Sequence, residues 1–146
     1  MRLHLFDEYT MLNVSQMRLL VHLKQYGVAN QETCFKFLDD YKLRPLIRNK
    51  YISHHDDMYR LLKKGFEQTA HIQPLVTISG NAKVIERALH TSYIAALYAK
   101  MGIDSSGVFM GNTFISFNKW REIRDGIIST TRFHGMLIHN HVRLAV

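Results

Sequence analysis

The fold is decided by residues 41–68, which read YKLRPLIRNKYISHHDDMYRLLKKGFEQ. Near the start of this stretch, Leu43, Leu46 and Ile47 recur at the i, i+3, i+4 spacing of a buried helical face, which predicts a helix. Pro45 interrupts the pattern, because proline lacks the backbone N–H that a helix interior requires and is tolerated only in the first turn. We therefore expect a helix that is short and starts late, or one that is distorted.

The middle of the same stretch predicts a β-hairpin. Residues 51–52 open one strand and residues 58–62 form the other. Asp56 and Asp57 lie between the strands, where aspartate is a favourable turn residue. The segment KKGFEQTA at 63–70 then predicts a short helix.

A helix is also predicted upstream, at 13–27, with the sequence NVSQMRLLVHLKQYG. Asn13 or Ser15 can cap its N-terminus by accepting a hydrogen bond from an unpaired backbone N–H. Gly27 is a suitable stop, because a residue without Cβ tolerates positive φ. The buried face is expected to consist of four apolar residues, Met17, Leu20, Val21 and Leu23.

A second upstream helix is predicted at 29–40, ANQETCFKFLDD, with Asn30 as its cap. Cys34, Phe37 and Leu38 form its expected buried stripe. Cys34 is the single cysteine, so the chain has no intramolecular disulfide, and we expect this thiol to be a small core residue. Only about three residues, 27–29, lie between the last turn of the first helix and the Asn30 cap, so the two helices should pack at a steep angle.

The sequence beyond the hairpin predicts an extended segment, a long helix and a small sheet. Residues 71–80 are expected to be extended, with Val76 and Ile78 alternating as in a strand. Residues 81–101 predict the longest helix, and its second half is apolar nearly all round, so it should be buried or covered by a partner. Residues 106–146 are rich in Phe, Ile, Thr and Val and predict a small antiparallel sheet that includes a hairpin around 139–140.

Composition and charge bound the class of protein. The 146 residues are 47% hydrophobic and 21% charged, which excludes a disordered chain, and no apolar run is long enough to cross a membrane. The formal net charge is +7. Residues 42–64 hold seven of the basic residues against two aspartates, a local charge of +5. A compact basic segment of this kind is typical of a protein that binds a polyanion, although a solvated basic face has the same pattern.

Three helices followed by a hairpin within about 60 residues resemble a winged helix-turn-helix. The resemblance rests on LIRNKYI at 46–52, on MYRLLKKGFEQ at 58–68 and on the two upstream helices. The pattern is similar to winged-helix regulators of the MarR and PadR types. It is also similar to the N-terminal domain of replication-relaxation proteins of bacterial plasmids and conjugative elements. The implied fold is α+β, with a winged helix-turn-helix at 10–70, and with the long helix and β-rich extension at 71–146.

The resemblance implies which residues contact duplex DNA. The helix that contains Arg44 and Arg48 would lie in the major groove, where arginine can bond guanine O6 and N7. Gln31 and Thr33, at the start of the preceding helix, could donate to a phosphate. Other basic residues would neutralise phosphates: Lys42, Lys50, Arg60, Lys63 and Lys64. Pro45 and the aspartates of the turn count against this interpretation.

The function expected from these features is DNA binding without catalysis. The chain would be a cytoplasmic transcriptional regulator or a replication protein of a mobile element, with no cofactor, metal or membrane contact. Residues 81–101 would pair it as a homodimer or with another protein. In the alternative interpretation, the winged helix is a protein-interaction scaffold in a replication or conjugation assembly, without direct DNA contact.

Catalysis and metal binding have weaker support in the sequence. A nuclease requires clustered carboxylates to hold magnesium, and residues 104–146 offer only Asp104, Glu122 and Asp125. A reduced nuclease-like domain at 104–146 is the remaining enzymatic alternative. The histidines near the C-terminus, such as His139 and His141, match no structural zinc spacing.

Overall fold

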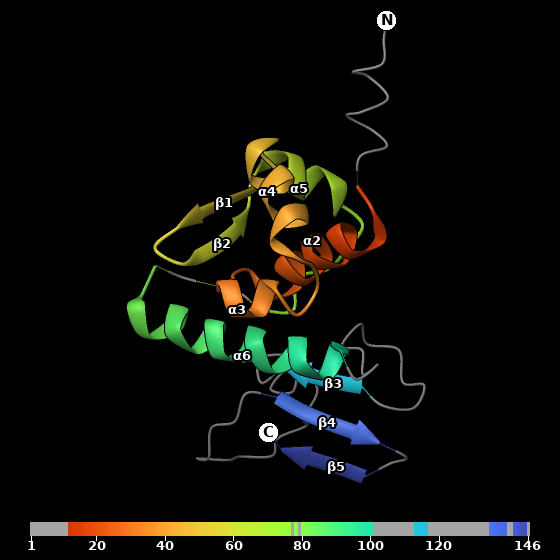
Figure 1. Ribbon diagram of the computed structural model, residues 1–146. Helices are drawn as coiled ribbons and strands as arrows, with labels where there is room; N and C mark the ends of the chain where they lie inside the picture. Colours follow the sequence, from red (N-terminus) through yellow and green to blue (C-terminus); the bar gives the residue numbers. More distant parts are fainter. Residues whose placement is uncertain are drawn as a thin grey trace, which may run out of the picture.

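The computed structural model describes residues 12–76, 78 and 80–100, together with three strands at 113–116, 135–139 and 142–145. In this part of the chain, five helices are combined with a two-stranded hairpin and a separate three-stranded sheet (Figure 1). The mixed α+β class expected from the sequence is confirmed. No described helix has the length and apolar character needed to cross a membrane.

Helix α2 (Val14–Tyr26) begins at a capping box. Asn13 is the N-cap, and its Oδ1 accepts from the Gln16 backbone N–H at 2.9 Å, while Gln16 Oε1 accepts from the Asn13 N–H at 3.0 Å. Ser15 is therefore not the cap, and its hydroxyl instead donates to Asn13 Oδ1. Gly27 ends the helix with φ +83°, as predicted.

The buried face of α2 differs from the predicted stripe. Leu20 and Leu23 are buried and the half-buried Met17 packs against the core, as predicted, whereas the half-buried Val21 is not part of it. The buried residues of α2 are Gln16, Leu19, Leu20, His22, Leu23 and Tyr26. The spacing rule could not distinguish the buried leucines from the apolar line that contains Val21, because α2 carries both of them.

Helix α3 (Gln31–Cys34) is a single turn, shorter than expected. Asn30 caps it as predicted, accepting from the Thr33 N–H at 2.8 Å. Cys34 and Leu38 are buried, as predicted, whereas Phe37 is only half-buried. Burial, followed by the charge of Asp57, raises the pKa of the Cys34 thiol to about 12, so this cysteine is an unreactive part of the core.

Helix α4 (Asp40–Arg48) contains Pro45 in its interior. The helix does not start late, so Pro45 lies beyond the first turn and supplies no N–H to the carbonyl four residues earlier. Burial of Leu43 and Leu46 at 1% exposure still holds the helix in place. Gln16 Nε2 adds a second anchor, because it donates to the Lys42 carbonyl at 2.9 Å.

The hairpin pairs β1 (Ile52–His55) with β2 (Met58–Leu61). Strand β2 ends one residue earlier than predicted. Asp56 and Asp57 have φ of +50° and +57°, the positive values that define a type I′ turn. The opposite edge of β2 pairs with the segment between α2 and α3 through an antiparallel bridge from Ala29 to Tyr59.

The chain continues into helix α5 (Lys63–Gln68) and then into α6 (Ala82–Lys100). The strand expected at Val76 and Ile78 is absent from the described residues between these helices. Val76 instead donates its N–H to the Gln25 carbonyl at the end of α2, at 3.1 Å. This backbone contact with a helix terminus takes the place of strand pairing.

Helix α6 packs against α2 through small side chains. Its buried residues are Ala88, Thr91, Ser92, Ala95 and Ala96, and not the line of larger apolar side chains. Ser92 Oγ lies 2.8 Å from Nε2 of the buried His22 on α2. Small residues allow the two helices to approach closely, and this polar contact fixes their register.

The predicted small antiparallel sheet is confirmed in outline. The order is β3 (Thr113–Ser116), β4 (Gly135–His139) and β5 (Val142–Ala145), with each neighbouring pair antiparallel. The predicted hairpin corresponds to β4 and β5, in which His139 pairs with Val142.

Candidate nucleic-acid interface

The outward face of α4 presents an aromatic side chain beside two arginines. Tyr41, Arg44 and Arg48 are all exposed and recur at i, i+3 and i+7, so they share one face of the helix. Tyr41 is 67% exposed. The sequence interpretation identified both arginines but missed Tyr41. Its spacing from the arginines, away from the buried leucines, was the available signal.

Arg44 is partly engaged within its own helix. Its Nε lies 2.6 Å from Oδ2 of Asp40, one turn earlier, and both side chains are at least half exposed. An exposed pair of this kind contributes little to stability. Its consequence is geometric, because it orients the guanidinium while leaving other N–H groups available to an acceptor.

Lys50 projects from the junction between α4 and β1. It has φ +67°, and the Lys50 N–H donates to the Ile47 carbonyl while the Tyr51 N–H donates to the Leu46 carbonyl. These two bonds form a Schellman motif, whose left-handed position is usually occupied by glycine. A lysine there costs about 1 kcal/mol or more of backbone strain, so a charged side chain is held at this point against local preference.

The hairpin carries one basic residue on its outward face. Arg60 pairs across the strands with Ser53, on the opposite face from the buried Tyr59 and Leu61. On the inner side, His54 stacks on Tyr59 with ring centroids 4.2 Å apart. The stack braces the strand that presents Arg60.

Lys63 and Lys64 do not belong to the hairpin. β2 ends at Leu61, and both lysines lie in the first turn of α5. Lys63 is exposed, and Lys64 Nζ lies 4.5 Å from the centre of the Tyr51 ring. The last member of the predicted set on α4, Lys42, is half-buried, with Nζ 5.7 Å from the Tyr41 ring centre.

The predicted phosphate contact at the start of α3 is wrong for one residue and obstructed for the other. Thr33 has 0% exposure, so its hydroxyl lies in the protein interior and cannot reach a phosphate. Gln31 is exposed, but its backbone N–H donates to Asp57 Oδ1 at 3.2 Å. A carboxylate from the hairpin turn therefore occupies the place that a phosphate would take.

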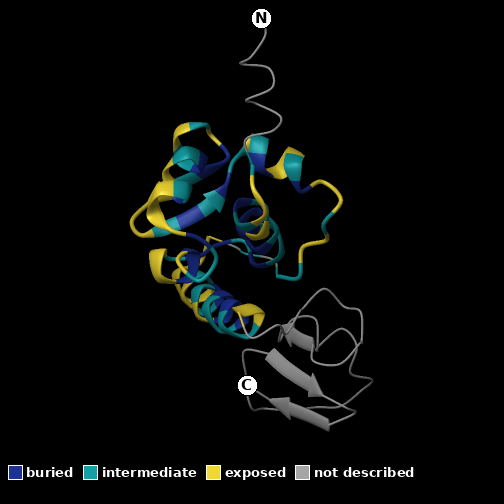
Figure 2. Ribbon diagram, turned by 45° about the vertical axis from the view of Figure 1, so that its right-hand side comes forward, coloured by how far each residue is buried: buried dark blue, intermediate teal, exposed yellow. Residues whose placement is uncertain are grey.

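The tip of the hairpin is acidic and exposed (Figure 2). Asp56 and Asp57 both project there, and Asp56 Oδ2 lies 3.2 Å from Nε2 of the exposed His55. Apart from Arg60 on β2, the basic residues flank the hairpin, on α4, at Lys50 and on α5, while the tip of the hairpin is negative.

The described residues bring no set of metal ligands together. In the ranges that the structure describes, no three His, Cys, Asp or Glu side chains gather as metal ligands. The carboxylates Asp104, Glu122 and Asp125 and the residue His141 lie outside those ranges. Comparisons of the chain with protein-family models, with curated proteins and with solved structures each find no match.

Proposed function

We propose that residues 10–70 form a winged helix-turn-helix that binds duplex DNA through α4 and the hairpin. The observation that carries the proposal is the placement of the basic segment 42–64. Its charge of +5 falls on an exposed helical face, on the turn that follows it and on the adjoining hairpin and helix. One continuous stretch of chain thus supplies both a helix for the major groove and flanking cations for the backbone.

The proposed contacts divide into two kinds. Arg44 and Arg48 face the base edges, where each can donate two hydrogen bonds to guanine, and Tyr41 offers an apolar surface beside them. Lys50, Arg60 and Lys63 lie on the flanking turn, strand and helix and would neutralise phosphates, which fixes orientation without reading sequence. Thr33 is excluded from the set, because it is buried.

The proposed biological role is that of a regulator or a replication protein of a mobile element, acting in the cytoplasm. A homodimer or a protein partner formed through residues 81–101 belongs to the same proposal. The scaffold alternative draws support from the acidic hairpin tip and from the Asp40 carboxylate beside Arg44, since both weaken the attraction of phosphate. The DNA titration below separates the two functions.

The proposal is tested by fluorescence anisotropy of a labelled random duplex at several salt concentrations. We expect micromolar binding at low salt, with a log–log slope of about −0.9 for each phosphate neutralised. Arg44→Ala/Arg48→Ala should weaken binding by roughly tenfold or more. Lys63→Ala/Lys64→Ala should weaken binding and also reduce the slope by up to about 2.

The matched control is Lys83→Ala/Lys100→Ala, which removes the same charge from the two ends of α6. If this pair weakens binding as much as the α4 pair, the affinity reflects net charge and not an interface on α4. A folded wild-type protein that binds no duplex at low salt would leave the scaffold function as the better account.

The hairpin tip provides a gain-of-affinity prediction. Asp56→Asn/Asp57→Gly removes two carboxylates and installs Asn-Gly, the preferred pair for a type I′ turn, so the hairpin should be retained. We expect DNA affinity at low salt to rise roughly threefold or more, because the tip no longer repels phosphate. The same anisotropy titration measures the effect. Unchanged or weaker binding would show that the tip lies away from the duplex.

A further inference from the structure

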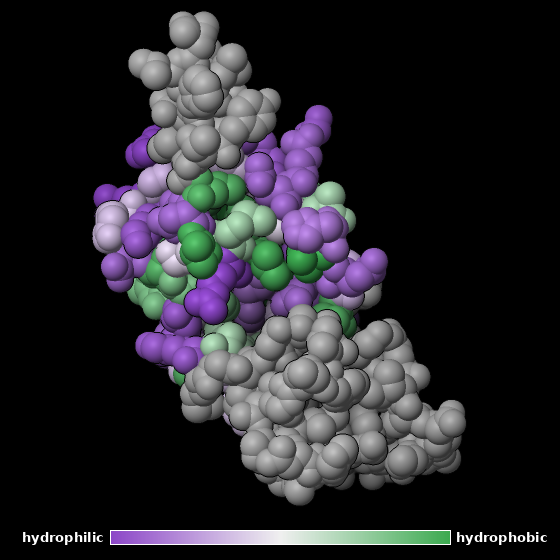
Figure 3. All heavy atoms as spheres, turned by 90° about the vertical axis from the view of Figure 1, so that its right-hand side faces the viewer, coloured by the Kyte–Doolittle hydropathy of each residue, from purple (hydrophilic) through white to green (hydrophobic). Residues whose placement is uncertain are grey.

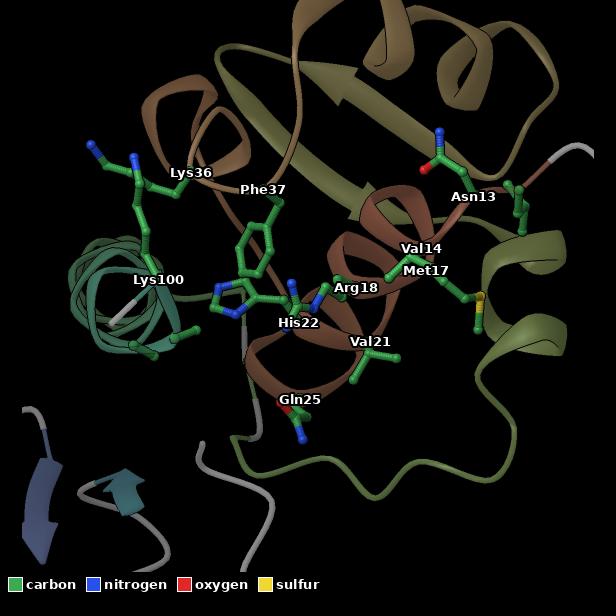
Figure 4. Close-up of a pocket in the computed structure, with 13 residues that line it drawn as sticks. Asn13, Val14, Met17, Arg18, Val21, His22, Gln25, Lys36, Phe37 and Lys100 are labelled. Carbon is green, nitrogen blue, oxygen red and sulfur yellow. The ribbon is translucent and has the colours of Figure 1, made fainter. Parts of the chain in front are cut away.

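A groove runs along α2, beside the face that enters the core. Its volume is about 840 Å³, and it is neither an enclosed cavity nor a flat surface. One wall comes from the turn after α3 and another from the C-terminal end of α6 (Figure 4). None of the residues proposed to contact DNA lines it, so it is a separate feature of the molecule.

The floor of the groove is apolar and elongated. Val14, Met17 and Val21 form the second apolar line of α2, and Val14 is 72% exposed. Phe37 and Ala95 continue the apolar lining on the two walls. The lining on α2 extends over twelve residues, from Val14 to Gln25, or about 16 Å at 1.5 Å per residue. Figure 3 shows apolar side chains gathered among polar ones on this side of the molecule.

The rim of the groove is cationic. Arg18, Lys36 and Lys100 line it from three different segments, and no described lining residue is acidic. Lys36 and Lys100 extend toward the same end of the groove (Figure 4). In the part of the chain that the structure describes, none of the three forms an ion pair, although Lys36 Nζ lies 5.6 Å from the Tyr93 ring centre. Like charges held together favour an anionic occupant.

We propose that this groove binds an amphipathic helix of a partner protein, with an apolar stripe on the floor and acidic residues along the rim. The apolar line from Val14 to Val21 covers about two helical turns, a length that fits the i, i+3, i+4, i+7 side chains of such a helix. A small ligand is usually enclosed on most sides, which this groove does not provide. A second copy of the chain in two-fold contact would bring the same cations face to face, so self-association on this surface is disfavoured.

The groove does not depend on DNA binding, and it specifies the partner contact already proposed for residues 81–101, because Ala95, Ala99 and Lys100 of α6 line it. The groove and α4 are also connected through α2. α2 carries the groove on one face, and Gln16 of the same helix donates to the α4 backbone. A partner seated in the groove would therefore rest on the helix that supports α4.

The test uses the full chain and a labelled fifteen-residue synthetic helix with leucines at i, i+3, i+4, i+7 and glutamates elsewhere. Two control peptides are used. The first has the same composition in scrambled order, and the second has lysine in place of each glutamate. The variant Lys36→Glu/Lys100→Glu reverses the rim. The matched control, Lys83→Glu, reverses an exposed charge at the other end of α6 and outside the groove. Anisotropy measures affinity, and methyl shifts of Met17, with Met58 of the hairpin as internal reference, locate the site.

We expect saturable binding that is weakened about tenfold by the double reversal, as two lost ion pairs and added repulsion imply. The Lys83→Glu variant should bind the peptide with wild-type affinity, and the two control peptides should show no specific binding. The methyl signal of Met17 should shift on binding, while that of Met58 should not. Absence of saturable binding up to millimolar peptide would overturn the proposal. Equal binding of the scrambled peptide, or insensitivity to the rim reversal, would overturn it as well.

Discussion

Gly65→Ala is expected to lower the free energy of unfolding by about 3 kcal/mol, the upper end of the usual effect of overpacking. A Cβ at this position would lie 2.4 Å from the Tyr51 carbonyl oxygen and 2.7 Å from Leu61 Cδ2. The first contact is with backbone, and that same oxygen accepts the Leu62 N–H at 2.9 Å, so it cannot move without breaking a bond at the start of α5. Urea denaturation followed by circular dichroism measures the loss.

The matched control is Gly80→Ala, because a Cβ there meets nothing within 4 Å. This substitution should change stability by less than about 0.5 kcal/mol. A Gly65→Ala protein as stable as wild type would mean that α5 does not approach the hairpin as closely as described. The glycine in the MYRLLKKGFEQ pattern thus has a packing role, which the pattern alone could not show.

Acid is expected to destabilise the protein through His22. Burial lowers the pKa of His22 from its ordinary value of 6.5 to about 3, and the hydrogen bond with Ser92 offsets only part of that effect. At neutral pH the imidazole is uncharged in the folded state and mostly uncharged in the unfolded state. Between about pH 6.5 and pH 3 the unfolded chain binds a proton that the folded protein excludes. The free energy of unfolding should therefore fall by about 1.4 kcal/mol per pH unit, or about 2 kcal/mol by pH 5.

His22→Gln separates this effect from the titration of carboxylates. Glutamine does not titrate, and its amide can still bond with the Ser92 hydroxyl. Unfolding free energies at pH 7 and pH 5, measured by urea denaturation, should fall about 2 kcal/mol less in the variant than in wild type. Equal losses in both proteins would show that His22 is accessible to protons in the folded state.

Local signals predicted much of the fold. The caps Asn13 and Asn30, the stop at Gly27 and the turn at 56–57 depend on residues close in sequence, and each was recognised correctly in outline. The predictions that were wrong concern residues whose local structure is determined by tertiary contacts. Pro45 is accommodated within α4, whose leucines are anchored in the core, and Val76 pairs with α2 instead of forming a strand.

The candidate site was only partly predictable for the same reason. Arg44 and Arg48 follow from helical spacing, because exposure on an amphipathic helix is a local property. The hydrogen bond from the Gln31 N–H to the carboxylate of Asp57 joins residues 26 positions apart, and no sequence pattern predicts it. The groove was missed because Val21 was assigned to the core, and because Met17 both packs against the core and lines the groove. An apolar line on a helix does not reveal whether it faces the interior or a cleft.

The bridge between Ala29 and Tyr59 has a consequence for how the hairpin meets any partner. Both backbone bonds, at 3.1 and 2.8 Å, tie β2 to the segment between α2 and α3, and the hydrogen bond of Asp57 with the Gln31 N–H ties the tip of the hairpin. A hairpin held by these contacts loses little conformational entropy when it binds a partner. Its amide protons should exchange with those of the helical core as one cooperative unit. Recognition would then resemble the docking of a preformed template more than the folding of a loop around its target.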